Sequence, residues 1–165
     1  MKDGKTVMKK TNVERILDQQ KLIYEVIHYE VSDGKIDGLS VAEKIGKPPE
    51  EVFKTLVTVG HSKALYVFLI PVAENLDMKK AAKVCGEKSI EMLAVKDIEK
   101  YTGYIRGGCS PIGMKKKYHT FIHQSIENGD YITVSAGKIG SQVRLNPEKL
   151  AQLTDAVFVD LIQKG

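Results

Sequence analysis

The sequence has 165 residues, 42% of them apolar, which is enough for one compact domain without disulfide bonds. No apolar run reaches the roughly 18 residues of a membrane helix, and two cysteines far apart make neither a disulfide framework nor a zinc site, so we expect a cytoplasmic protein. The net charge of +4 favours a nucleic-acid partner but is too small to establish one. Polar residues 1–10 are expected to form a tail before a single domain over residues 11–165.

The first predicted element is a helix over residues 12–20, because Thr11 and Glu14 have the spacing of a capping box. Residues 22–30 then favour a strand, since they are rich in aromatic and β-branched side chains. Residues 32–34 have the composition of a turn.

A second capping box is predicted at Ser40 and Glu43, ahead of a short helix that ends at Gly46. Two prolines and two glutamates follow at residues 48–51. Proline is common at the first position of a helix, so a further helical turn is predicted there.

A hairpin is predicted next, because apolar residues 53–60 and 64–72 flank the short polar segment 61–63. Asp77 then has the position of a helix cap for residues 78–85, and Gly86 marks the end of that helix.

The next part of the chain is predicted to contain a brief strand over residues 90–93 and a helix that ends before Gly103. Residues 118–123 and 131–135 favour two strands, with Asn-Gly-Asp at residues 128–130 as the turn between them.

The C-terminal part continues with extended structure near Val143, a helix over residues 147–153 capped by Asn146, and a strand over residues 157–161. Helices and strands intermix without regular β-α-β alternation. The predicted fold is therefore mixed α/β, with a curled mixed sheet or barrel and peripheral helices.

Lys54 is the most informative charged residue, because it lies within an otherwise apolar predicted strand. A buried ammonium without a partner is costly, so this lysine either extends to solvent at the strand edge or meets an acceptor. The acceptor can be a carbonyl or phosphate oxygen of a ligand. The residue pattern leaves both interpretations open.

Two loops rich in small residues are candidates for ligand contact. In the first, Arg106 precedes Gly107 and Gly108, whose N–H groups suit an ester oxygen that develops negative charge. The second contains Ser135 and Lys138, which supply a hydroxyl and a cation. Either loop is equally well explained as an ordinary turn.

Other candidates for chemistry have simpler explanations. His119 and His123 are four residues apart, which in a strand is about 13 Å and too far for both rings to bind one ion. Cys109 is a potential nucleophile but fits equally a small buried residue. Ser110 lies outside the Gly-x-Ser-x-Gly pattern of a nucleophile elbow. We therefore expect no metal and no cofactor.

In combination and order, three segments resemble the YbaK family: Phe53-Lys54-Thr55-Leu56, residues 104–113 and residues 134–138. The likeness extends over nearly the whole chain after Met8. It is strongest to the free-standing Cys-tRNA(Pro) deacylases, relatives of the editing domain of bacterial prolyl-tRNA synthetases.

The resemblance implies a mixed α/β, barrel-like fold and a hydrolytic activity. The implied reaction cleaves the ester that joins a mischarged cysteine to the tRNA for proline. Aminoacyl-tRNA is then the substrate, and prolyl-tRNA synthetase is a candidate partner. In this branch the thiol of the substrate cysteine attacks its own ester, so no enzyme nucleophile is needed.

The resemblance also implies roles for individual residues. The lysine that matches Lys54 is the key substrate-binding residue of the family, and with Gly107 and Gly108 it is expected to hold the ester. Further substrate contacts are expected from Tyr29, Thr55, Arg106, Ser135 and Lys138. The chain differs from the family pattern at Ala136, where relatives often carry glycine, at Gln142, near which they carry an acidic residue, and in the loop at residues 36–38, where they carry an aromatic residue.

Two alternatives stay open at this point. One keeps the fold but makes the substrate Ala-tRNA(Pro) or another small aminoacyl-tRNA, attacked by water. The other is a module that binds an aminoacyl or nucleotide end without chemistry.

Overall fold

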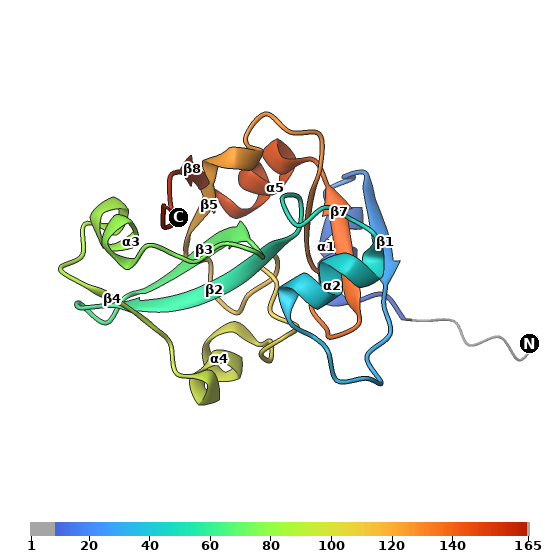
Figure 1. The fold of residues 1–165 in the computed structure, drawn as a ribbon, viewed down its shortest axis with the longest axis horizontal. Helices are drawn as coiled ribbons and strands as arrows, with labels where there is room; N and C mark the ends of the chain where they lie inside the picture. The colour runs from blue at the N-terminus through green and yellow to red at the C-terminus, as the bar shows by residue number, and fades with distance from the viewer. Residues whose placement is uncertain (1–8, 165) are drawn as a thin grey trace, which may run out of the picture.

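The computed structural model describes residues 9–164, and its strands form two sheets (Figure 1). Residues 1–8 of the expected tail lie outside this range. The smaller sheet is antiparallel and contains, in order, β1 (Tyr24–His28), β7 (Ser141–Leu145) and β6 (Ile132–Ser135). The larger sheet is mixed and contains, in order, β4 (Ile90–Met92), β2 (Phe53–Gly60), β3 (Leu65–Pro71), β5 (His119–His123) and β8 (Val157–Val159). The mixed α/β class predicted from the sequence is confirmed.

Helices surround the two sheets. In the described residues they are α1 (Asn12–Gln19), α2 (Gly38–Ile45), α3 (Met78–Cys85), α4 (Val95–Thr102), α5 (Pro147–Thr154) and the short 3-10 helix η1 (Gln124–Ile126). Helices α1 and α2 lie beside the smaller sheet and α3 lies beside the larger one (Figure 1). The predicted capping box of α1 is confirmed, because Thr11 Oγ1 accepts from the Glu14 N–H and the Glu14 carboxylate accepts from the Thr11 N–H. Within residues 9–164, no helix combines the length and the apolar character of a membrane span.

The start of α2 differs from the prediction. Asp37 is the N-cap, and its carboxylate accepts from the backbone N–H of Ser40 at 3.2 Å and from the Ser40 hydroxyl at 2.6 Å. A capping box at Ser40 and Glu43 is therefore wrong, because the stronger acceptor three residues upstream begins the helix earlier. Gly46 ends α2 in a left-handed conformation, with φ of 69°, as predicted.

Residues 48–51 form a turn and not the predicted helical turn. The Glu51 N–H donates to the Pro48 carbonyl at 2.9 Å, and the Thr133 N–H donates to the Glu51 carbonyl at 3.0 Å. Since the next residue, Val52, forms a bridge with Thr133, the chain is already extended here and cannot continue a helix.

The predicted hairpin of β2 and β3 is confirmed, with Phe53 opposite Pro71 and Lys54 opposite Ile70. By contrast, β5 and β6 do not form a hairpin. Strand β5 pairs in parallel with β3 and β8, whereas β6 pairs with β7 in the other sheet. The turn at residues 128–130 therefore connects two sheets.

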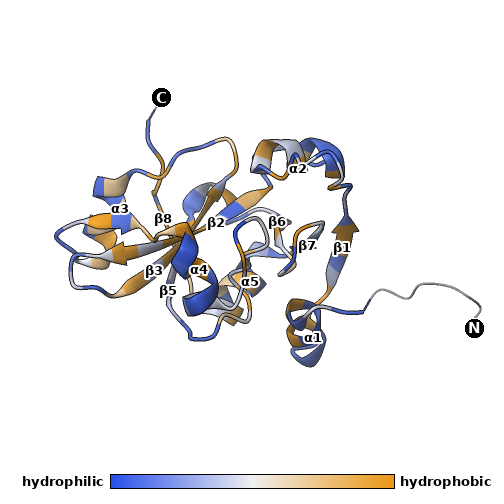
Figure 2. Ribbon diagram, turned by 90° about the horizontal axis from the view of Figure 1, so that it is seen from below, coloured by the Kyte–Doolittle hydropathy of each residue, from blue (hydrophilic) through white to orange (hydrophobic). Residues whose placement is uncertain are grey.

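The apolar side chains concentrate on the strands, whereas α4 is mostly hydrophilic and buries only Thr102 (Figure 2). The larger sheet packs Phe68 against Phe121, with ring centroids 5.4 Å apart. Leu17 from α1 and Leu150 from α5 are fully buried against the strands. The two sheets thus share a core that extends under the helices.

The two sheets meet at a seam between Val52 and Thr133, which form one parallel bridge. Glu51 fastens this seam, because its Oε2 atom accepts from Thr133 Oγ1 at 2.8 Å and from Arg144 Nε at 2.9 Å. Arg144 lies on β7, so one carboxylate on the β2 side holds both β6 and β7.

Candidate active site

A cavity of about 510 Å³ opens beside this seam. Its walls are the start of β2, the loop from β1 to α2, the loop after α4 and the end of β6. Such a volume suits a small ligand or one end of a larger one. Residues predicted for the site line it from four separate segments: Tyr29, Lys54, Thr55, Arg106, Gly107 and Ser135.

Lys54 enters the cavity from β2 with its side chain partly buried. Burial lowers the pKa of the Lys54 ammonium, and the carboxylate of Glu74 offsets part of that effect. Among residues 9–164 no carboxylate forms an ion pair with Lys54. The ammonium is therefore placed to meet an oxygen atom of a ligand.

Two hydroxyl groups in the cavity wall are buried without a partner among the residues that the structure describes. Tyr29 Oη and Thr55 Oγ1 have no hydrogen bond to any described residue. Leaving such a group unsatisfied costs about 1–3 kcal/mol, so it needs an explanation. Because both residues line the cavity, a polar ligand that hydrogen-bonds to them supplies that explanation.

Ser135 contributes a third hydroxyl at the end of β6. Its Oγ accepts from the Gly137 N–H at 3.1 Å, which leaves the hydroxyl proton for a ligand oxygen. Opposite Ser135 in the ladder is Gln142 on β7, which is buried and also lines the cavity. The residue pattern had not assigned Gln142 to the site, although a polar residue in a buried strand is the same signal that singled out Lys54.

The paired glycines have different positions. Gly107 lines the cavity with φ of +88°, a conformation that glycine adopts without strain. Gly108 is outside the lining, and its N–H donates to the Ile105 carbonyl at 3.0 Å. A Cβ atom on Gly108 would lie 3.0 Å from the backbone of Lys138 and Ile139. Gly108 thus packs the first loop against the second, and Lys138 lies at that contact and not in the cavity lining.

Cys109 also lines the cavity, but its environment does not favour a thiolate. Burial raises the pKa of the Cys109 thiol to about 11, with a smaller opposing effect from the Thr102 hydroxyl. The thiol is therefore protonated at neutral pH and a poor nucleophile. Ser110 is fully buried and its Oγ accepts from the Ile112 N–H at 3.3 Å, so that hydroxyl stabilises the turn.

The N-terminal end of α2 completes the wall through Ile36, Asp37 and Leu39. A Cβ atom on Gly38 would lie 2.5 Å from Val72 Cγ1, so glycine lets the helix approach the strand end closely. The family resemblance links residues 36–38 to the pocket lining, as a loop in which relatives carry an aromatic residue, but the sequence indicates no role for Leu39, because a helix start gives no local signal of what it faces.

A second hollow of about 530 Å³ contains none of the predicted site residues. Its charged residues include Glu51 and Arg144, which already pair with each other at 2.9 Å. Arg144 also lies over the ring of Tyr131, 3.7 Å from its centroid. These groups are satisfied within the protein, in contrast to those of the first cavity.

Comparison with known proteins identifies the family and the fold. Residues 39–153 match the model of the aminoacyl-tRNA editing domain. The chain belongs to the aminoacyl-tRNA editing domain family. The matched range contains Lys54, the glycine loop and Ser135, and the cavity is thus the candidate active site of an editing domain.

Three similar proteins cover nearly all of the chain. A protein of Enterococcus faecalis, assigned as a Cys-tRNA(Pro)/Cys-tRNA(Cys) deacylase and named EbsC, is 44% identical over 97% of this chain and 98% of its own length. A solved structure described as a trans-editing enzyme for prolyl tRNA synthetase has a TM-score of 0.80 and 21% identity. The match covers 95% of this chain and 100% of that protein. The structure of the protein APE2540 has a TM-score of 0.84 and 18% identity, covering 93% of this chain and 100% of its own. The two structures share the fold of this editing domain.

Proposed function

We propose that residues 11–165 form one deacylase domain that hydrolyses the ester of cysteine mischarged onto the tRNA for proline. The observation that carries this proposal is the cavity in which the Lys54 ammonium faces the same space as the unpartnered hydroxyls of Tyr29 and Thr55. An aminoacyl ester with its terminal ribose offers the oxygen atoms that these groups require.

The ester end of the substrate is held by fixed groups of the cavity in this proposal. Lys54 binds the ester carbonyl and stabilises negative charge that develops on its oxygen. Gly107 lets the backbone approach the same atom closely, while Ser135 and the two unpartnered hydroxyls orient the ribose and amino acid. Arg106 is exposed at the cavity rim and suits a phosphate of the acceptor end.

The nucleophile is the thiol of the substrate cysteine. An unperturbed thiol has a pKa of about 8.5 and is partly ionised at neutral pH, whereas the pKa of Cys109 is raised to about 11. The substrate sulfur attacks the ester carbon, a C–S bond replaces the C–O bond, and the ribose oxygen leaves with the proton of the thiol. Water then opens the strained cyclic thioester to free cysteine. Intramolecular attack in a fixed geometry reaches effective molarities of about 10⁵ M or more.

The Enterococcus relative bears the name of a deacylase for both Cys-tRNA(Pro) and Cys-tRNA(Cys). This name favours recognition of the acyl group over recognition of one tRNA body. We extend the proposal to both tRNAs and place the reaction in the cytoplasm, with prolyl-tRNA synthetase as a partner that delivers the mischarged tRNA for proline.

Deacylation of Cys-tRNA(Pro), Cys-tRNA(Cys) and Ala-tRNA(Pro), measured side by side with the purified protein, tests the proposal. We expect both cysteinyl esters to be hydrolysed, while the alanyl ester, which lacks a thiol, persists at the rate measured without protein. Cleavage of the alanyl ester at a similar rate shows that water is the nucleophile. Persistence of all three esters overturns the deacylase function.

A further inference from the structure

The loop from β1 to α2, residues 29–37, forms one wall of the cavity. Tyr29, Ile36 and Asp37 from this loop line the cavity. A Cβ atom on Gly107 would lie 3.0 Å from Ile36 Cδ1, so the loop touches the glycine loop across the cavity. The position of this wall therefore sets how much room the acyl group has.

Apolar burial does not hold this wall in place. Residues 30–35 are exposed without interruption, and Val31 exposes 39% of its surface. A segment with few buried apolar contacts opens at low free-energy cost unless hydrogen bonds fix it. The polar contacts of the loop therefore decide its position.

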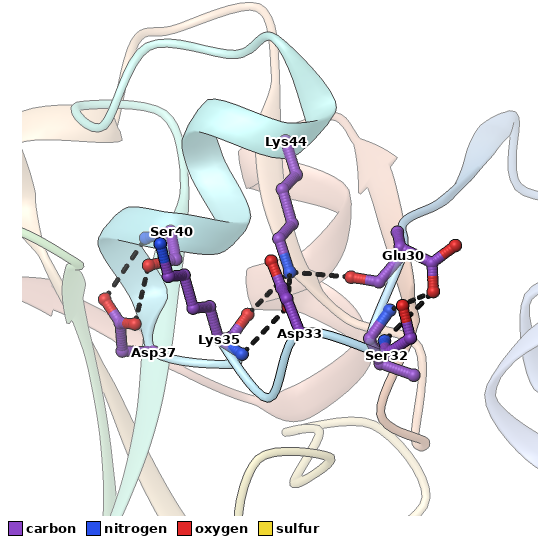
Figure 3. A network of polar contacts seen from close by, with 8 residues as sticks. Glu30, Ser32, Asp33, Lys35, Asp37, Ser40 and Lys44 are labelled. Atoms are coloured by element: carbon purple, nitrogen blue, oxygen red, sulfur yellow. Dashed lines mark hydrogen bonds and ion pairs between the residues drawn. The ribbon is translucent and has the colours of Figure 1, made fainter.

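Lys44 supplies these contacts from α2, with its side chain directed into the loop (Figure 3). Its Nζ donates to the Glu30 carbonyl at 2.6 Å, to the Lys35 carbonyl at 2.8 Å and to Asp33 Oδ1 at 2.8 Å. All three donors of the ammonium are thus used, and the side chain is only 18% exposed. Its Nζ also lies 6.0 Å from the ring centroid of Tyr29.

The other hydrogen bonds in the middle of the loop are local. The Glu30 carboxylate accepts from the N–H groups of Val31 and Ser32, and Asp33 accepts from the Lys35 N–H (Figure 3). These bonds shape individual turns, while the ends of the loop are fixed by the Tyr29 N–H, which donates to the Gly140 carbonyl at 2.9 Å, and by Asp37, the N-cap of α2. Lys44 joins the exposed middle of the loop, from Glu30 to Lys35, to α2.

We infer that Lys44 is a positioning residue that holds the loop wall of the cavity and thereby sets which acyl group is accepted. The inference rests on the proposed deacylase function. Lys44 does not line the cavity and acts through Tyr29 and Ile36. Without the ammonium, the wall moves away from the glycine loop, the ester is less well oriented, and larger acyl groups enter.

Lys44→Met tests this inference, with Lys80→Met as the matched control. Lys80 makes a similar connection outside the cavity, since its Nζ donates to Asp160 Oδ2 and to the Ile162 carbonyl, both at 2.8 Å, and its side chain is 27% exposed. Both variants lose a partly buried lysine that holds a nearby segment. They differ in whether that segment borders the cavity.

The measurement is kcat and KM for Cys-tRNA(Pro), together with the inhibition constant of Pro-tRNA(Pro), which carries a bulkier acyl group and has no thiol to cleave its own ester. For Lys44→Met we expect kcat on the cysteinyl ester to fall about tenfold or more, because small misplacement of a reacting group has effects of up to 10²-fold. We also expect the selectivity of binding, the ratio of the inhibition constant of Pro-tRNA(Pro) to the KM of Cys-tRNA(Pro), to shrink by a similar factor. Lys80→Met should lower the melting temperature and leave both quantities unchanged.

Asp33→Asn provides a graded variant, because it removes the charged acceptor but keeps the two carbonyl acceptors of Lys44. Its selectivity should lie between that of the wild type and that of Lys44→Met. If the wild type is active and Lys44→Met keeps its selectivity, the inference is overturned while the proposed function stands. The same holds if Lys80→Met loses as much selectivity as Lys44→Met. An inactive wild type overturns the proposed function, and the inference with it.

Discussion

Tyr29, Lys54 and Thr55 place polar atoms in the cavity at a cost to the folded protein. The two hydroxyls have no partner among the described residues, and burial lowers the pKa of Lys54. Removing such groups should stabilise the fold, since neither a lost hydrogen bond nor a lost ion pair opposes the gain. Residues kept at a cost to stability are typical of sites that bind a ligand.

For Lys54→Met we predict that deacylation falls by about 10²- to 10³-fold, the usual effect of removing a group that stabilises charge in the transition state. The melting temperature should not fall. Because the pKa of Lys54 is lowered in the folded state, the unfolded chain binds this proton more tightly, and the charged lysine opposes folding at neutral pH. Lys79→Met, at an exposed position of α3, is the control for both assays. A rate equal to the wild type would contradict the assignment.

For Tyr29→Phe we predict that the free energy of unfolding rises by about 1 kcal/mol, because an unsatisfied buried hydroxyl is removed. Tyr104→Phe is the matched control. The Tyr104 Oη donates to the Ile112 carbonyl at 2.6 Å, so its removal should lower the same quantity by about 1 kcal/mol. Urea unfolding of both variants measures the free energy of unfolding, which should rise in Tyr29→Phe and fall in Tyr104→Phe. Equal losses in both would show that Tyr29 Oη has a partner within the protein.

For Cys109→Ala we predict near-normal turnover on Cys-tRNA(Pro). The Cys109 thiol is protonated at neutral pH, since burial raises its pKa to about 11, and in the proposed reaction the substrate supplies the sulfur. Single-turnover rates at neutral pH provide the measurement. Complete loss of activity, with the fold intact, would make Cys109 the nucleophile.

At the scale of elements, the site depends on the contact between two loops. Gly108 packs the glycine loop on the backbone of Lys138 and Ile139, and Gly107 is thereby fixed in the cavity wall. The sequence resemblance placed both glycines at the ester. The structure separates them, with one on the cavity wall and the other in the packing behind it.

For Gly108→Ala we predict a loss of about 1–3 kcal/mol of stability, as expected for overpacking, together with a clear loss of deacylation. The new Cβ lies 3.0 Å from backbone atoms, which cannot rotate away, so the two loops must separate. Gly129→Ala is the control, since its Cβ would lie 3.2 Å from the Ile126 carbonyl oxygen, outside the cavity. It should affect thermal unfolding without affecting turnover.

The elements that could be predicted from the sequence are those with local signals. Thr11 caps α1, Gly46 ends α2, and the β2–β3 hairpin follows from two apolar runs around a short polar segment. The start of α2 was missed because Asp37 competes with Ser40 as the cap. The separation of β5 from β6 was missed because strand pairing between distant segments leaves no local pattern.

In the candidate site, too, some features have a local signal in the sequence and others depend on contacts between distant segments. Lys54 could be singled out from the sequence as a cation in an apolar strand, but its meeting with Tyr29 and Ser135 requires the fold. The missing partners of Tyr29 and Thr55, and the support that Lys44 gives to the loop, are properties of three-dimensional geometry. No spacing in the sequence predicts them.

At the scale of the whole molecule, the C-terminal segment is tied to β5 through a neutral imidazole. His123 Nδ1 accepts from the Leu161 N–H at 3.1 Å, which requires an unprotonated nitrogen. Burial lowers the pKa of His123, an effect that Lys80 reinforces and that Asp160 and Glu74 partly oppose. The imidazole therefore couples folding to protons in the acidic range.

We predict that the wild type loses stability as the pH falls below about 6.5, the ordinary pKa of histidine, towards the lower pKa of His123 in the folded state. In this window the unfolded chain binds the proton and the folded chain does not, so unfolding is favoured. His123→Asn keeps an acceptor atom without a titratable group and should flatten the curve of melting temperature against pH. His119→Asn, at the exposed end of β5, should leave the shape of this curve unchanged. Identical curves for all three proteins would contradict the prediction.

The seam between the sheets has a consequence for substrate fit. Val52 and Thr133 form one bridge there, and the Glu51 carboxylate accepts hydrogen bonds across it from Thr133 and Arg144. Since Lys54 and Ser135 stand on opposite sides of this junction, a change in the angle between the sheets widens or narrows the space between them. By bonding to Thr133 on β6 and to Arg144 on β7, the Glu51 carboxylate therefore helps to set the width of the space that receives the substrate.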